Sequence, residues 1–155
     1  MATHRKLDIA TGQLRSAVML YCTGRDRFSA ITLAGAADVI LSQLLVNQGK
    51  QNFSDQLMKK EAEVTGVLPK RAVHGRAIND MLMINAMKHL DPGEDEYLEM
   101  DVRVSALATV GKALANYYAL VGAETADATD FMTLFKLWAQ AFTPKGLDLD
   151  GNPIE

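Results

Sequence analysis

The chain has 155 residues, of which 48% are apolar, so it can form one domain with a packed core that needs no disulfide or metal. Its single cysteine, Cys22, excludes an intramolecular disulfide and any zinc site built from several cysteines. The N-terminal residues lack the apolar block of a secretory signal, and no apolar run approaches the ~20 residues that span a bilayer. We therefore expect a cytoplasmic protein without a membrane partner.

The net charge of −3 is unevenly distributed along the chain. Residues 1–90 hold 12 Lys and Arg against 7 Asp and Glu, whereas residues 91–155 hold 4 against 12. This asymmetry suits a basic face that contacts phosphate, or a charge-matched contact between subunits. Solvated surfaces of mixed sign are the simpler explanation, and the one that we favour.

Apolar residues recur at spacings of three and four through most of the chain, and no segment alternates with the period of a strand. The pattern predicts helices over residues 4–22, 27–48, 55–64, 70–90 and 102–121, and a last one that begins at Asp127 or Thr129 and ends at Phe142. Gly35 lies inside the second of these helices, where glycine costs about 1 kcal/mol against alanine, so we expect a packing reason for it. The prediction is an all-α, up-and-down bundle of about five to six helices in residues 1–142, with a polar tail at 143–155.

The helix predicted over residues 70–90 is apolar on two sides. Such a helix is normally enclosed by neighbours, so we predict that it is the central rod of the bundle or is shared between two subunits. Met81, Ile84 and Met87 form an adaptable apolar group and are the candidate residues of a homodimer interface.

Residues 62–76 partly match a helix-turn-helix, with basic side chains such as Arg71 on the second helix. The great length predicted for that helix and the acidic chain argue against DNA binding, which stays an alternative. The acidic turn at 91–96 lacks the Glu and His spacing of a di-iron bundle. We predict no metal and no cofactor.

Asn85 and His89 are the candidate catalytic residues. They lie one turn apart on the same face of the predicted helix, with Lys88 beside them. A histidine near a helix C-terminus is stabilised in its protonated form, which can contact phosphate or act as an acid. An alternative is a structural hydrogen-bond pair.

The segments FSAITLAGAADVILSQLL and INAMKHLD resemble the HEPN superfamily of small helical bundles, and the resemblance covers roughly residues 5–121. Members often carry an acidic residue in an alanine-rich helix, at the place that Asp38 occupies here. They also carry an arginine, then a polar residue, and then a histidine four to six positions after the arginine. By position these are Ile84, Asn85 and His89.

In active HEPN members, the resemblance implies, the arginine holds a phosphate and the histidine assists proton transfer during metal-independent RNA cleavage at a dimer interface. Isoleucine cannot hold a phosphate. The main prediction is therefore a non-catalytic HEPN-like bundle that acts through homodimerisation and through protein, nucleotide or RNA contacts. A ribonuclease that uses His89 with an arginine from elsewhere is the enzymatic alternative. The candidate ligand or RNA contacts are Lys88, Arg71, Arg76 and Asp38.

Overall fold

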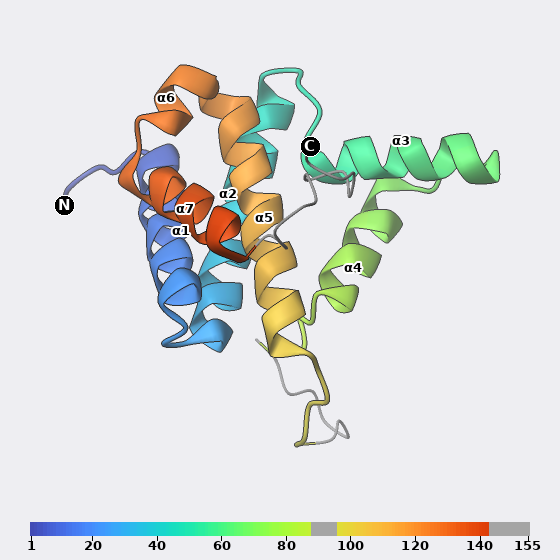
Figure 1. Ribbon diagram of the computed structural model, residues 1–155. Helices are drawn as coiled ribbons and strands as arrows, with labels where there is room; N and C mark the ends of the chain where they lie inside the picture. The colour runs from blue at the N-terminus through green and yellow to red at the C-terminus, as the bar shows by residue number, and fades with distance from the viewer. Residues whose placement is uncertain (88–95, 143–155) are drawn as a thin grey trace, which may run out of the picture.

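The computed structural model describes residues 1–87 and 96–142, and within these ranges every regular element is a helix (Figure 1). The seven helices are α1 (Lys6–Thr23), α2 (Arg27–Asn47), α3 (Phe53–Thr65), α4 (Arg71–Met81), α5 (Val102–Val121), α6 (Ala123–Asp127) and α7 (Asp130–Phe142). The all-α prediction is confirmed for these residues. The predicted tail, 143–155, lies outside the described residues.

Helix α2 lies at the centre of the fold, between α1 on one side and α5 on the other. Small side chains make these close contacts, because Ala30, Ala34 and Ala37 are all fully buried along α2. Helices α1 and α2 are antiparallel, whereas α2 and α5 run in the same direction because the intervening α3 and α4 return the chain (Figure 1). The central helix is therefore α2, which corrects the prediction that residues 70–90 form the central rod.

Aromatic side chains attach α7 to the other helices. The ring centroid of Trp138 lies 4.8 Å from that of Tyr21 in α1, and Phe131 lies 5.4 Å from Tyr117 in α5. Phe131 is only 2% exposed, and burial of such a ring stabilises the fold by about 1.5–3 kcal/mol. The short α6, which the sequence analysis did not predict, makes the turn that brings α7 back onto this surface.

Helices α3 and α4 project from the bundle as an arm (Figure 1). Asn52 begins α3 with a capping box, accepting from the amide of Asp55 at 2.9 Å while the Asp55 carboxylate accepts from the Asn52 amide at 3.2 Å. No residue of α3 is buried, and Ile78 is the only buried residue of α4. The arm therefore contributes little to the core, and Ile78 is the side chain through which its helices enter it.

The helix predicted over 70–90 ends at Met81, which corrects the predicted boundary. Met83 has a φ of 59°, in the left-handed region, and the amide of Ile84 donates to the carbonyl of Asn79 at 2.9 Å. This turn places Ile84 in the core, where a Cβ added to Gly35 would lie 3.0 Å from its Cγ2 atom. A left-handed residue costs about 1–2 kcal/mol, and burying Ile84 offsets that cost. Gly35 therefore has the packing reason that its position predicted.

Helix α2 is long and apolar enough to cross a membrane by length and composition, contrary to the expectation that no segment comes close. Its composition is largely alanine, leucine, isoleucine and valine, as is usual for a helix in the middle of a core. Part of its surface is buried against α1 and α5.

Candidate functional site

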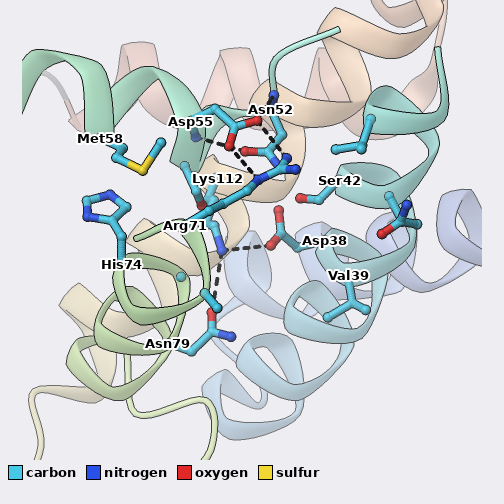
Figure 2. A pocket seen from close by; sticks show the side chains of 15 residues that line it. Asp38, Val39, Ser42, Asn52, Asp55, Met58, Arg71, His74, Asn79 and Lys112 are labelled. Atoms are coloured by element: carbon cyan, nitrogen blue, oxygen red, sulfur yellow. Dashed lines mark hydrogen bonds and ion pairs between the residues drawn. The ribbon is translucent and has the colours of Figure 1, made fainter. Parts of the chain in front are cut away.

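A cleft lies between the arm and the bundle, with a cavity of about 660 Å³ (Figure 2). Helices α2 and α5 form its inner wall, while α3, α4 and the segment before α3 form its outer wall. Polar side chains dominate the lining, which comprises Asp38, Ser42, Gln43, Asn52, Ser54, Asp55, Arg71, His74, Asn79 and Lys112 together with Val39, Val46, Met58, Ala72 and Gly75.

A buried ion pair forms the floor of the cleft. Nζ of Lys112 lies 2.7 Å from Oδ2 of Asp38, and their side chains are only 6% and 7% exposed. Asn116, one helical turn after Lys112, donates to Oδ1 of Asp38 at 2.6 Å and to the hydroxyl oxygen of Ser42 at 3.1 Å. These bonds join α5 to α2. Asn116 follows Lys112 by one turn and Ser42 follows Asp38 by one turn, so two successive turns of one helix face two successive turns of the other.

The same network reaches the arm. Lys112 donates to the Asn79 side chain of α4 at 3.4 Å, and the side-chain oxygen of Asn116 accepts from the amide of Phe53 at 2.8 Å. On the outer wall, Arg71 and Asp55 form a two-point ion pair with both nitrogen–oxygen distances at 2.7 Å. Polar contacts around the cleft thus join the arm to the bundle, together with Ile78 of α4, which belongs to the core.

His74 lies on α4 beside Met58 (Figure 2). Its Nδ1 atom is 3.1 Å from a carboxylate oxygen of Glu61 on α3, and its side chain is 12% exposed. Its other ring nitrogen, Nε2, is buried without a hydrogen-bond partner in the described part of the chain. A buried polar atom without a partner costs about 1–3 kcal/mol, so this nitrogen favours a ligand that supplies one.

The chemistry that this cleft offers is hydrogen bonding. Its four charged side chains are matched in two pairs, Asp38 with Lys112 and Asp55 with Arg71, so no net charge attracts an anion or a cation. The remaining polar lining supplies amide, hydroxyl and imidazole groups, which, beside the apolar Val39, Val46 and Met58, suit a small uncharged polar ligand.

The structure brings Asp38 and Arg71, two of the predicted contact residues, to this one cleft, on opposite walls. Each is already held by an oppositely charged side chain. Arg76 lies elsewhere, exposed on the outer face of α4. Lys88 and His89 lie outside the described residues.

The three interface candidates differ in exposure. Ile84 is 3% exposed and belongs to the core of its own chain, which corrects its expected place at an interface. Met87 is partly buried against that core, and Met81 is 69% exposed. Asn85 donates to the Asp80 carboxylate at 2.8 Å, so it stabilises the turn after α4.

Sequence reasoning missed Lys112 and Asn116, which complete the polar floor. A detectable signal exists, because Lys112 is the only charged residue between Val104 and Val121 in otherwise apolar α5, and Asn116 follows it by one turn. A charged side chain on a buried helical face requires a partner, and Asp38 is the corresponding charged residue of α2.

Comparison of the chain with protein-family models, with curated proteins and with solved structures found no match.

Proposed function

We propose that the chain is a HEPN-like, non-catalytic helical bundle that acts by pairing with a second copy of itself in the cytoplasm. The order of helices supports the HEPN-like assignment, since successive long helices reverse direction apart from α3, which lies across them (Figure 1). Asp38 stands in the alanine-rich α2, and Ile84, at the motif's arginine position, packs on that same helix.

The observation that carries the pairing is an apolar patch on the arm. Large apolar side chains that are 62–87% exposed occur along the arm, on α4, on the end of α3 and on the connection between them; they are Val64, Val67, Leu68, Val73 and Met81 and are called the arm patch below. An exposed apolar patch of this kind marks an interaction site in a soluble protein.

The charges beside the arm patch favour a second copy as its occupant. On the outer face of α4, Arg76 and Asp80 are exposed one turn apart and flank Ala77. If two copies of α4 pack antiparallel about a two-fold axis near Ala77, each Arg76 faces the opposite copy's acidic position. The same surface is then self-complementary in both charge and apolar character.

A sedimentation experiment on arm variants tests this proposal. Met81→Glu and Val73→Glu each place a charge in the patch, and both should convert a dimer to monomers, because a buried unpaired charge costs several kcal/mol. Leu137→Glu is the matched control, since Leu137 is 59% exposed on α7, away from the arm. Equal sedimentation of all three variants and the wild type as monomers would refute the pairing.

A ribonuclease that uses His89 is the enzymatic alternative. It needs an arginine for the phosphate, and Ile84 at the motif position is buried. Arg71 would have to leave its two-point pair with Asp55, whereas Arg76 is exposed and forms no ion pair with the residues that the structure describes. Incubating the protein with a mixed RNA pool in EDTA decides between the non-catalytic bundle and the ribonuclease. We expect intact RNA, whereas cleavage that His89→Ala abolishes would show a ribonuclease.

Binding of a small uncharged polar ligand, such as a nucleobase, is a second candidate function, and the unpartnered Nε2 of His74 favours it. Titration of nucleosides, observed by the chemical shifts of His74, tests it with His74→Phe as the variant.

The third hypothesis is duplex DNA binding through residues 62–76, in which Val67 and Leu68 lie exposed between the two helices. Salt-independent or absent duplex binding would exclude it.

A further inference from the structure

A smaller cavity of about 300 Å³ lies at the end of the bundle where α1 ends, and none of its lining residues belongs to the arm. The end of α1, the start of α2 and the start of α5 meet there, and α7 closes the side. Its lining residues are Tyr21, Cys22, Thr23, Gly24, Arg27, Arg103 and Trp138, called the end cavity below.

Two guanidinium groups converge on the end cavity. Arg27 folds back across the turn after α1, with its Nη2 atom 3.6 Å from the position of a Cβ on Gly24. Burial raises the pKa of Tyr21, while the positive charges of Arg103 and Arg27 act in the opposite direction. Both arginines therefore lie within electrostatic reach of the same hydroxyl, although they come from different helices.

No carboxylate neutralises this pair among residues 1–87 and 96–142. Arg15, Arg71, Lys112 and Lys136 all form ion pairs there, whereas neither Arg27 nor Arg103 does. Nε of Arg27 is moreover buried without a hydrogen-bond acceptor among the described residues. Buried donors of a charged group normally have an acceptor, so within this part of the chain the two guanidinium groups lack the anion that would pair with them.

The acidic side chains that lie close to these arginines in the sequence act as helix caps. Asp26 caps α2 and accepts from the amide and hydroxyl of Ser29, and these bonds lower its pKa. Asp101 caps α5 and accepts from the amides of Arg103 and Val104. Burial raises the pKa of Cys22 to about 11, so its thiol is neutral at physiological pH. The lining itself thus carries two positive charges and no negative one.

We propose that the end cavity binds a tetrahedral phosphoryl dianion, supplied either as free phosphate or as a phosphomonoester. Each guanidinium presents a planar fork of donors that matches two phosphate oxygens, and the Tyr21 hydroxyl adds a further donor. Helices α2 and α5 both begin at this end of the bundle (Figure 1). The partial positive charge at their N-termini favours a bound anion. Trp138 forms an apolar wall on which the organic part of a monoester packs.

Trp138 is the only tryptophan in the chain, so its fluorescence reports on the end cavity directly. Inorganic phosphate, titrated at constant ionic strength against chloride, should change this fluorescence saturably with a Kd of about 1 mM or tighter. Arg103→Gln should weaken binding at least tenfold, because it removes a charge-assisted fork. Arg103 is exposed, so this variant should fold normally, which circular dichroism verifies. Arg25→Gln is the matched control: Arg25 is exposed in the same turn and does not line the cavity, and less than a twofold change is expected.

A parallel titration with glycerol 3-phosphate identifies the source of the phosphoryl group. Tighter binding than phosphate supports the proposal with a monoester as the ligand, and equal binding supports it with free phosphate. The proposal is overturned if phosphate and the monoester both fail to saturate, or if Arg103→Gln and Arg25→Gln bind phosphate equally well. Both tests are independent of self-association, since the arm patch lies on other helices.

Discussion

Removing the Lys112 charge tests whether the polar floor of the cleft is the buried pair that the geometry describes. In Lys112→Met, Asp38 keeps its 2.6 Å bond from Asn116 but loses the cation that pairs with it. Breaking a buried ion pair by removing one partner costs about 3–5 kcal/mol. The surviving Asn116 bond places the expected loss near the lower end, about 3 kcal/mol, which corresponds to a fall in Tm of roughly 10 °C for a chain of this size.

Lys136→Met is the matched control for this measurement. The Lys136–Asp127 pair has the same nitrogen–oxygen distance, 2.7 Å, but its side chains are 51% and 42% exposed. An exposed pair contributes about 0–1 kcal/mol, so equal distances should give very different losses of stability. Urea unfolding of both variants, followed by far-ultraviolet circular dichroism, gives the two free energies of unfolding.

A double variant separates loss of the pair from loss of packing. The double variant Asp38→Asn with Lys112→Met removes both charges. The side-chain oxygen of the new asparagine at position 38 can still accept the hydrogen bond from Asn116. We expect it to recover most of the stability that Lys112→Met loses, because no uncompensated charge remains. The reasoning is refuted if Lys112→Met costs no more than Lys136→Met, or if the double variant is as unstable as the single one.

Two further predictions concern Ile84 and Cys22. Ile84→Ala should lower the free energy of unfolding by about 2–5 kcal/mol, whereas Met81→Ala should change it by less than about 0.5 kcal/mol, as urea unfolding will show; similar losses would contradict the burial of Ile84. Because burial raises the pKa of Cys22 to about 11 from 9.0, iodoacetamide at pH 8 should alkylate it about 100-fold more slowly in the folded than in the urea-unfolded chain. Between pH 9 and 11 the folded chain keeps this proton whereas the unfolded chain loses it, so the free energy of unfolding should fall as pH rises above about 9. An alkylation rate as fast in the folded chain as in the unfolded chain would contradict the shift.

The helices that surround the core were predictable because their local signals agree with their packing. The apolar spacing of α1, α2 and α5 matches their buried residues, and Asp101 caps α5 at the predicted start of that helix. Gly35 also signalled a close contact, which Ile84 makes. In these segments local propensity and tertiary packing favour the same conformation.

The end of α4 was not predictable from local pattern. Residues 82–87 have good helical propensity, and nothing in them resembles a stop signal. The turn at Met83 forms because it carries Ile84 into a notch that exists only once Gly35 of α2 is in place. Tertiary burial here overrides propensity, which no inspection of one segment reveals.

The candidate site was predictable only in part for a similar reason. Asp38 and Arg71 were named from the sequence, but their partners Lys112 and Asp55 lie far from them along the chain. Pairing across helices depends on their relative register, which depends on the α3–α4 arm. The convergence of Arg27 and Arg103 on one cavity likewise follows from the parallel course of α2 and α5.

The molar mass of the wild-type chain in solution tests the proposed self-association most directly. Sedimentation equilibrium at tens of micromolar should give twice the 16.9 kDa of one chain, and dilution should shift the mass toward that of the monomer. Met81→Glu under the same conditions should give the monomer mass with an unchanged circular dichroism spectrum. A wild-type mass of one chain at every concentration would contradict the account, and so would a dimer that Met81→Glu leaves intact.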